Sequence, residues 1–361
     1  DLRLVPGSTL ENAGDNTVSV TDDVDGDARP HDGTIDIGAD ETGQSGCTDA
    51  TACNYDAAAI NDDGSCISSE VSVQGREIWV NCETYKIRGV TYSPIAVGDT
   101  RLDGNDFSNI STDIQLMTEA CISTIRTYTP ITDAAVLDSF AAAGIKIIMG
   151  FPNFDDRTVP GPDIQGGGYL TYINTYKNHP AILMWEFGNE YNYHPDWFGN
   201  DINNWYTILE NAAQAVHAAD PDHPVSTAHG ELPDSNALAS APSVDVWGMN
   251  VYRNDNPEGI FSEWKAVSDK PMYLSEAGAD NYDNNAGAVN EDTAAHAIAN
   301  IWKDYLKNVN IGSGITFFSF TDGWWKDTGG SANTQDVGGF AGAIPFDGFA
   351  NEEYWGIVDI N

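Results

Sequence analysis

The sequence predicts an α/β protein whose main part is a (β/α)8 TIM barrel, preceded by a small extension rich in Asp, Gly and Cys. Two observations predict the barrel. From about residue 87, short apolar runs alternate with longer stretches of helical periodicity. This alternation supplies eight strands over roughly 280 residues, which is the size of such a barrel. A doubly wound open sheet is the alternative, but it would place a Gly-rich phosphate loop after the first strand, where residues 89–94 read GVTYSP.

The expected barrel strands are short apolar runs that begin after turn signals. They lie at residues 87–92, 124–128, 145–151, 182–187, 225–229, 244–251, 272–275 and 314–320. The expected helices place apolar residues on one face, as Ile110, Ile114 and Met117 do. They lie at residues 106–120, 134–143, 168–177, 203–218 and 293–306. Ahead of them, residues 71–88 alternate as short strands, and we expect a hairpin that closes the bottom of the barrel.

The chain is expected to contain three parts. Residues 1–45 are acidic and poor in aromatic side chains, and they resemble the closing segment of bacterial right-handed β-helix proteins. Residues 46–70 resemble short Cys/Asp-rich modules of secreted or surface proteins of marine bacteria, and are interpreted as a linker. Residues 71–361 form the barrel domain. Because the chain begins within a motif, at Asp1-Leu2-Arg3, we expect a processed form or part of a longer protein.

Strong acidity excludes some partners. The chain carries 55 Asp and Glu against 16 Lys and Arg, a net charge of −39, which argues against nucleic acid and anionic membranes because both would be repelled. No apolar run reaches about 18 residues, so no transmembrane helix is expected. Asp23, Asp25 and Asp27 are candidate ligands of a structural calcium ion. A solvated acidic loop is the alternative, since the twelve-residue calcium loop with its terminal Glu is missing. A monomer is expected.

The cysteines indicate an extracellular protein. Cys47, Cys53 and Cys66 fall within twenty residues of a Gly/Asp/Asn-rich segment, as in a disulfide-stapled module. Zinc is the rival interpretation, but this cluster has no His and no Cys-x-x-Cys spacing. The pairing among these three and Cys82 stays open, and Cys121 is expected to be an ordinary buried thiol. Together these features predict a secreted or cell-surface bacterial protein.

Two glutamates follow short apolar strands. Residues 182–190 read ILMWEFGNE, in which a buried strand opens into a polar and aromatic loop at Glu190. Residues 271–280, PMYLSEAGAD, repeat this arrangement at Glu276. Because the carboxyl ends of barrel strands share one face, the pair is positioned for chemistry. Glu186 lies deeper in the same strand and is expected to be a polar group inside the barrel. Glu231 and Glu263 are the other carboxylates that could be mistaken for catalysts.

At these residues the chain resembles the retaining glycoside hydrolases of clan A, with features of families 17, 72, 158 and 2. The resemblance rests on Trp185 to Glu190 and on Leu274 to Gly278, and it extends over residues 83–361. It implies that Glu190 is the general acid/base after strand 4 and Glu276 the nucleophile after strand 7. Such enzymes need no cofactor, and their two carboxyl groups lie about 5–5.5 Å apart.

Polar and aromatic residues end nearly every expected strand, as at the catalytic face of a barrel. Asn189 is expected to bind the sugar 2-hydroxyl, and Arg126 and Tyr252 to keep Glu276 ionised. His229 is expected to contact Glu190 or substrate, with a structural role as the alternative. Further candidate substrate contacts at or near strand ends are Tyr92, Tyr128, Asn153, His194, Asn250, Trp324 and Trp325, and other aromatic candidates are Trp197, Trp205, Trp264 and Trp355.

These features predict a retaining glycosidase that cleaves a β-linked polysaccharide by double displacement. The loops 161–168, 191–200 and 329–349 are long enough to shape an extended cleft, so an endo-β-1,3-glucanase acting on a laminarin-like β-glucan is the leading hypothesis. A glycosidase or transglycosylase acting on another β-glycan, such as a galactan or mannan, is the alternative. A noncatalytic carbohydrate-binding surface protein is a third hypothesis. A metal-dependent barrel hydrolase would need clustered His and Asp at strand ends, where only His229 is offered.

Overall fold

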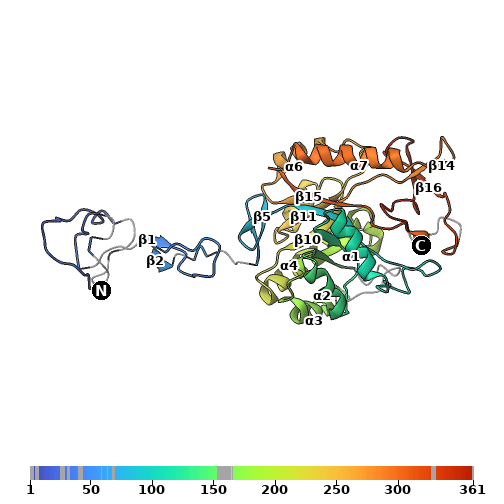
Figure 1. Ribbon diagram of the computed structural model, residues 1–361. Helices are drawn as coiled ribbons and strands as arrows, with labels where there is room; N and C mark the ends of the chain where they lie inside the picture. Colours follow the sequence, from blue (N-terminus) through green and yellow to red (C-terminus); the bar gives the residue numbers. More distant parts are fainter. Residues whose placement is uncertain are drawn as a thin grey trace. The chain divides into compact units, whose positions relative to one another are not determined.

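The computed structural model describes residues 4, 8–24, 29–30, 33–39, 44–57, 59–62, 64–66, 70–152, 164, 166–326 and 331–359. The chain forms two compact units, residues 1–70 and residues 71–361 (Figure 1).

A closed barrel of eight parallel strands forms the larger unit. Its strands are β6 (Ile87–Thr91), β7 (Thr124–Arg126), β8 (Lys146–Phe151), β9 (Ile182–Asn189), β10 (Val225–Gly230), β11 (Val246–Asn250), β12 (Met272–Glu276) and β15 (Gly312–Phe317). The barrel closes where β15 pairs with β6, with Phe317 opposite Val90. This closure confirms the predicted (β/α)8 barrel and rules out the open sheet.

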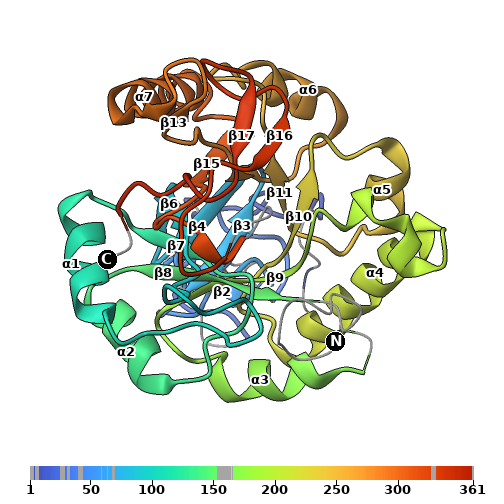
Figure 2. The ribbon, with the colours of Figure 1, turned by 90° about the vertical axis from the view of Figure 1, so that its right-hand side faces the viewer.

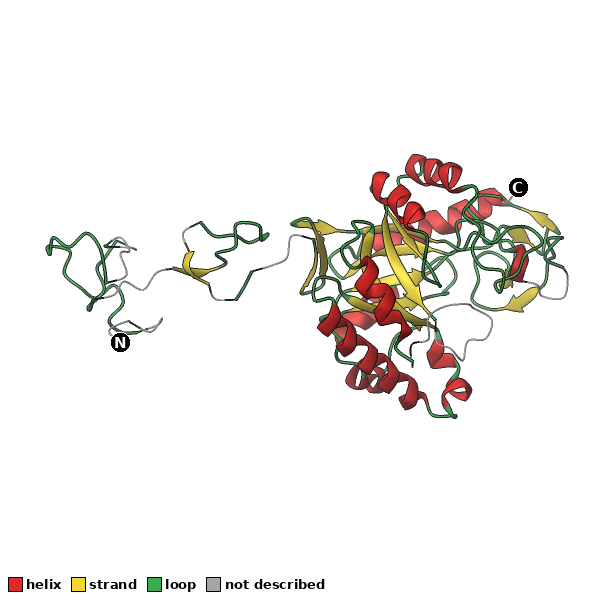
Figure 3. Ribbon diagram, turned by 90° about the horizontal axis from the view of Figure 1, so that it is seen from below, coloured by secondary structure: helices red, strands yellow, loops and turns green. Residues whose placement is uncertain are grey.

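Helices surround the strands, as Figures 2 and 3 show. They are α1 (Ile110–Glu119), α2 (Ala134–Ala142), α3 (Gly168–Tyr176), α4 (Ile202–Ala219), α5 (Ser235–Ser240), α6 (Gly259–Val267) and α7 (Glu291–Leu306). Asp133, Asp201, Asp234 and Asn290 cap α2, α4, α5 and α7 by accepting a backbone N–H of the first turn. The sequence prediction omitted α5 and α6, because six and nine residues are too short for a clear helical period.

The barrel is filled from both sides of its strands. Side chains on the outer face, such as Trp185 and Phe187 of β9, belong to the large core that packs against the helices. Side chains on the inner face form a second cluster. A three-stranded antiparallel sheet of β3 (Val71–Gln74), β4 (Glu77–Val80) and β5 (Glu83–Tyr85) adds to this inner cluster. Ile78 thereby shares a core with Ile87 and Met184, so the sheet closes one end of the barrel.

The opposite end carries the connecting segments. Three short 3-10 helices lie here in the chain after β9 and β15: η1 (Tyr191–Tyr193), η2 (Pro195–Phe198) and η3 (Trp324–Lys326). Two antiparallel hairpins complete the unit, formed by β13 (Tyr282–Asp283) with β14 (Ala288–Val289), and by β16 (Gly339–Ala341) with β17 (Phe349–Asn351). None of the described helices combines the length and apolar character needed to cross a membrane.

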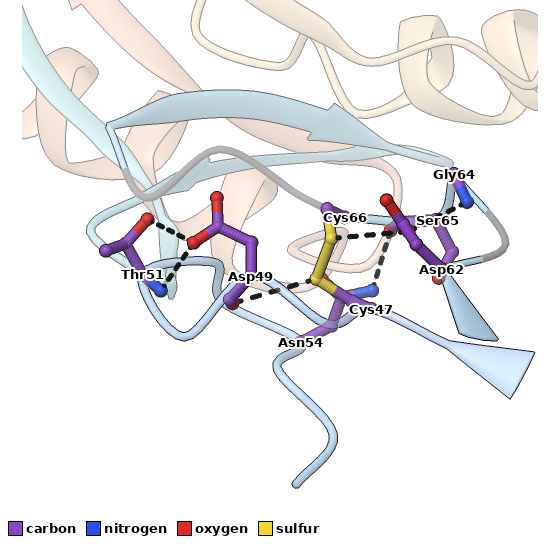
Figure 4. The surroundings of a disulfide bond; sticks show 8 residues. All are labelled: Cys47, Asp49, Thr51, Asn54, Asp62, Gly64, Ser65 and Cys66. Atoms are coloured by element: carbon purple, nitrogen blue, oxygen red, sulfur yellow. Dashed lines mark hydrogen bonds between the residues drawn. A yellow bond between two sulfur atoms is a disulfide. The ribbon is translucent and has the colours of Figure 1, made fainter. Parts of the chain in front are cut away.

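A disulfide bond joins Cys47 and Cys66 in the smaller unit, next to the parallel pair β1 (Gln44–Gly46) and β2 (Ala59–Asp62). The loop that it closes is held by local hydrogen bonds (Figure 4). Asp49 Oδ1 accepts from the Thr51 backbone N–H at 2.8 Å, and Asn54 Nδ2 donates to the Ser65 carbonyl at 2.7 Å.

One expectation is wrong, and a second lies largely outside the described residues. Cys121 is exposed rather than buried. It follows the last turn of α1 with φ = 57°, so it occupies the left-handed position that ends a helix and faces away from the core. The calcium expectation falls largely outside the described residues, since Asp25 and Asp27 are not among them. Within the described part of the chain, no group of three or more His, Cys, Asp or Glu could hold a metal ion.

Ile78→Ala is expected to lower the free energy of unfolding by about 2–5 kcal/mol, because Ile78 is fully buried in the inner cluster and its loss leaves a cavity. Chemical denaturation measures the effect. Leu102→Ala is the control, since Leu102 is 67% exposed and its truncation should stay within about 0.5 kcal/mol. Equal losses for the two variants would show that the small sheet does not close the barrel.

Candidate active site

The carboxyl ends of β9 and β12 bring the two predicted catalytic glutamates into one cavity. Glu276 is the last residue of β12, and Glu190 follows directly after β9. Both line a cavity of about 450 Å³. Glu190 has φ = 56°, a left-handed conformation that is uncommon for a residue with a side chain. Such backbone outliers gather at functional sites, where the surrounding fold holds them in place.

Gly188 makes the turn after β9 possible. Its φ of 73° favours glycine, and a Cβ there would lie 2.7 Å from the Trp205 ring and 2.8 Å from the Tyr191 ring. The chain can therefore pass close to these two aromatic side chains only without a side chain of its own. This close passage fixes where Asn189 and Glu190 enter the cavity.

Three donors hold the Glu276 carboxylate. Arg126 Nη1 donates to Oε1 at 3.0 Å, the Tyr128 hydroxyl donates to the same oxygen at 2.7 Å, and the Tyr252 hydroxyl donates to Oε2 at 3.0 Å. Burial, together with the negative charge of Glu276, raises the pKa of both tyrosines well above their ordinary value. Both hydroxyls therefore stay protonated and act as donors to the Glu276 carboxylate.

Arg126 connects Glu276 to the barrel interior. Its side chain is 1% exposed, and its Nε donates to Glu186 Oε1 at 2.5 Å. Glu186 also accepts hydrogen bonds from the hydroxyls of Tyr273 and Ser226. The structure thus places Glu186 as a buried partner of Arg126, with its oxygens occupied by protein donors, in agreement with the expected role inside the barrel.

Asn189 is oriented by two donors. Its Oδ1 accepts from Arg126 Nη2 at 2.8 Å and from Asn250 Nδ2 at 3.1 Å, while Asn250 Oδ1 accepts from the Ser275 hydroxyl at 2.7 Å. Since the acceptor oxygen is used, the amide nitrogen of Asn189 remains as a donor. Asn189 lines a second cavity, of about 290 Å³, that also includes Glu190. This donor has the chemistry needed to bind a sugar hydroxyl.

The electrostatic surroundings separate the two glutamates. Burial and the charge of Glu276 raise the pKa of Glu190 to about 7. The nearby Asn250 amide and the cations of Arg126 and Lys326 oppose this shift in part. Glu190 is therefore largely protonated below neutral pH, as a general acid must be, while Glu276 is surrounded by donors.

Tyr92 and His229 do not reach the site, contrary to the prediction. Tyr92 is fully buried, packs on Phe140 and donates its hydroxyl to Asp113 of α1 at 2.5 Å. His229 lies beside Tyr206 of α4, and its Nδ1 is 3.1 Å from the Glu231 carbonyl oxygen. The physical reason is the period of two along a strand, which turns both residues outward to the helices.

Some aromatic candidates line the cavities and others belong to the core. His194 and Trp197 stack with ring centroids 4.0 Å apart and both line the smaller cavity. Trp355 lines the larger cavity and packs edge-on against Tyr252. Trp325 lines a recess beside Tyr128, whereas the neighbouring Trp324 is half-buried and lines none of these cavities.

Trp205 and Trp264 are buried in α4 and α6, so neither is available to a sugar. Asn153 lies outside the described residues, as do parts of the loops 161–168 and 329–349. Glu231 lines the larger cavity, where it forms an ion pair with Arg253, and Arg253 also pairs with Glu263. Both of these glutamates are therefore committed to Arg253.

Sequence reasoning missed several residues that line the two cavities, because they come from the segments that connect the barrel strands and helices and carry no periodic pattern. They are Arg101, Tyr193, Phe318, Lys326, Phe340 and Glu352. Lys326 Nζ pairs with Glu352 Oε2 at 2.6 Å and lies 4.3 Å from the centroid of the Phe318 ring. The Phe318–Ser319 peptide bond beside it is cis.

The fold and this pair of glutamates define a glycoside hydrolase barrel. A family model described as "Glycosyl hydrolases family 2, TIM barrel domain" matches residues 170–309, a segment that includes both Glu190 and Glu276. A search of curated proteins gave no match. Of the families that the sequence resembles, this match supports family 2, and it supports a glycoside hydrolase of clan A as the wider class.

Solved structures share the fold. A family 2 β-galacturonidase from Eisenbergiella tayi bound to galacturonate superposes with a TM-score of 0.57 and 18% identity, covering 80% of this chain and 50% of that protein. A β-glucuronidase from Faecalibacterium prausnitzii has a TM-score of 0.54, 17% identity and coverages of 80% and 49%. A β-glucuronidase from Bifidobacterium dentium, complexed with coumarin-3-O-glucuronide, has a TM-score of 0.56 and 19% identity, covering 80% of this chain and 46% of that protein. The chain thus spans about half the length of these proteins.

Tyr252→Phe is expected to lower kcat/KM about 10- to 100-fold, because the hydroxyl donates a charge-assisted hydrogen bond to Glu276. Tyr92→Phe is the matched control, since its hydroxyl bonds to Asp113 outside the site and its loss should affect stability but leave kcat/KM within about twofold. Steady-state kinetics on a substrate identified as described below measures both. Equal effects of the two variants would contradict this view of the site.

Proposed function

We propose that the chain is a retaining β-glycosidase that hydrolyses a β-linked saccharide by double displacement. The observation that carries the proposal is the contrast between two glutamates in one cavity. Glu276 accepts hydrogen bonds from an arginine and two tyrosines, whereas burial and the charge of Glu276 raise the pKa of Glu190 to about 7. One carboxyl group can therefore attack while the other supplies a proton.

In the first step, a Glu276 oxygen attacks the anomeric carbon and the glycosidic C–O bond breaks. Glu190 transfers its proton to the departing oxygen, so the leaving group departs as an alcohol and the sugar stays esterified to Glu276. The Asn189 amide donates to the sugar 2-hydroxyl, an interaction that strengthens as positive charge develops on the ring. Asn250 and Arg126 keep that amide in place.

In the second step, Glu190 takes a proton from water, whose oxygen attacks the anomeric carbon and releases Glu276. This change of role has an electrostatic cause. Once Glu276 is esterified, its negative charge is gone, and that charge is one of the two causes that raise the pKa of Glu190. The pKa of Glu190 therefore falls in the intermediate, and the acid becomes a base.

The substrate class has two candidates. The larger and smaller cavities share Glu190, which supports a cleft with several sugar subsites and thus cleavage within a polysaccharide such as β-1,3-glucan. The solved structures reported above are a β-galacturonidase and two β-glucuronidases, which brings acidic β-glycosides into consideration instead of the laminarin-like glucan. Galactan, mannan, transglycosylation and noncatalytic binding are the remaining alternatives.

We further propose action outside the cell as a monomer, without a cofactor for catalysis. The Cys47–Cys66 disulfide supports an oxidising location, since disulfides persist in secreted and surface proteins. The acidity of the chain, at a net charge of −39, supports neither nucleic acid nor anionic membranes as partners.

Glu276→Ala is expected to abolish turnover on a panel of β-glucans, β-galactans, β-mannans and aryl β-uronides, because no nucleophile remains, while folding is preserved. Product analysis identifies the substrate, and proton NMR of the wild-type reaction should show the β-anomer as the first product. Initial release of the α-anomer would contradict double displacement. A fully active Glu276→Ala variant would overturn the site assignment.

Activity is expected to fall as pH rises through about 7, because Glu190 acts as an acid and loses its proton there. The pH dependence of kcat/KM measures this limb. In Glu190→Gln the limb should vanish, and substrates with a phenolate leaving group, which needs no proton, should be far less affected than natural saccharides. Persistence of the same limb in Glu190→Gln would assign it to another group.

A further inference from the structure

The smaller cavity adjoins the bond to be cleaved. It has a volume of about 290 Å³ and is lined by Asn189 and Glu190 from the end of β9. The stacked rings of His194 and Trp197 form part of its wall, and aromatic faces of this kind pack against sugar rings. A cavity with an aromatic wall beside the general acid has the features of a sugar subsite.

Two arginines line this cavity, and the structure uses them differently. Arg126 is buried, and its guanidinium is already bonded to Glu186, Glu276 and Asn189. Arg101 is half-buried, and its guanidinium carbon lies 5.0 Å from the centroid of the Trp325 ring. Within the described part of the chain, Arg101 forms no hydrogen bond or ion pair. Its N–H donors therefore remain available.

The third basic group at the glutamates is committed. Lys326, which lines the larger cavity, pairs with Glu352 at 2.6 Å. A chain with 55 acidic and 16 basic residues offers abundant partners for any cation. Among the described residues Arg101 has no carboxylate partner, so its position on an aromatic face in the cavity that Glu190 also lines is a distinctive feature of this site.

Guanidinium chemistry indicates the ligand. Arginine binds carboxylate and sulfate oxygens through two parallel N–H donors, and stacking on Trp325 limits the orientations of its plane. The net charge of −39 repels anions in general. An acidic saccharide could bind here only where a cation meets its charge, and Arg101 supplies one in the cavity that Glu190 also lines.

We infer that the smaller cavity is a subsite for an anionic sugar, whose carboxylate or sulfate group binds Arg101. The inference rests on the proposed glycosidase function and specifies its substrate class. It places the anionic group on a sugar unit beside the cleaved bond, while the aromatic wall of His194 and Trp197 contacts the ring. Recognition of this group lowers KM and leaves the chemical step to Glu190 and Glu276.

Arg101→Gln tests the inference in the full chain. Three sets of β-linked oligosaccharides serve as probes, neutral, uronic acid-containing and sulfated, otherwise of equal length. The variant should raise KM for the anionic probe about 10- to 100-fold with kcat nearly unchanged, and should leave the neutral probe within about twofold. Arg101→Lys should restore only part of the loss, because lysine keeps the charge but lacks the two-donor fork.

Arg88→Gln is the matched control. Arg88 is exposed, belongs to β6 and lines none of the described cavities, so the variant makes the same change of charge away from the site. This variant should leave KM and kcat unchanged for all of the probes. The wild-type preference for the anionic probe should also weaken as salt is raised, because salt screens the charge. The uronic acid and sulfated probes show which anionic group the subsite takes.

Binding measured by calorimetry separates this inference from the proposed function. If the wild type binds the anionic probe and Arg101→Gln does not, the subsite is supported. If the wild type also turns over none of the probes, that result counts against the glycosidase function and not against the subsite. Turnover of a neutral probe that Arg101→Gln does not alter, with no preference for the anionic probes, overturns the subsite and leaves the glycosidase standing. Equal loss on neutral and anionic probes also overturns it, because Arg101 would then only support the cavity wall.

Discussion

The site depends on one buried cation. Arg126 is 1% exposed at the centre of the barrel, and a charge in that position is tolerated only when it is fully paired. Its three nitrogens bind Glu186 within β9, Glu276 at the end of β12 and Asn189 at the end of β9. Removing the arginine would leave the buried carboxylates of Glu186 and Glu276 without their common cation, and breaking a buried pair in this way costs about 3–5 kcal/mol. The interaction therefore joins the stability of the barrel to the geometry of its catalytic groups.

That pairing also creates the difference between the two glutamates. Glu276 has an arginine and two tyrosines as hydrogen-bond donors to its buried carboxylate. Its charge then acts on Glu190, which is itself buried, and the pKa of Glu190 rises to about 7. Two identical side chains thus acquire opposite roles from their surroundings. The barrel supplies this arrangement because its strands end at a common face, where residues distant in sequence meet.

The outer parts of the site are built from loops that follow the barrel strands. Loops after the strands, rather than the strands themselves, contribute Arg101, Lys326 and the His194–Trp197 stack. Such loops decide which sugar fits, while the pair of glutamates decides the chemistry. This division explains why the family match points to a class of reaction and not to a particular sugar. Arg101 and Lys326 are cations of these loops, and their positive charges bear on whether a neutral or an anionic substrate binds.

The sequence by itself determined the barrel and the pair of glutamates that meet in one cavity at its carboxyl end. The barrel strands and longer helices show their periodicity in the sequence, and Glu190 and Glu276 each follow an apolar run. The local pattern was therefore sufficient to predict the barrel and the position of these two glutamates. The predictions that placed Tyr92 and His229 in the site were wrong, because a position at a strand end does not reveal to which side of the sheet the side chain points. The register of the closed barrel decides that side. The prediction that Cys121 is buried was wrong, because the residue lies at the end of a helix and is exposed to solvent.

The tertiary structure alone decided the environment of each group. The partners of Arg126 come from β9 and β12, 60 and 150 residues away in sequence. The pKa of Glu190 depends on burial and on a charge contributed by another strand. Arg101 meets Trp325 across more than half of the chain. Electrostatic interactions act through space, and only the closed barrel sets those distances.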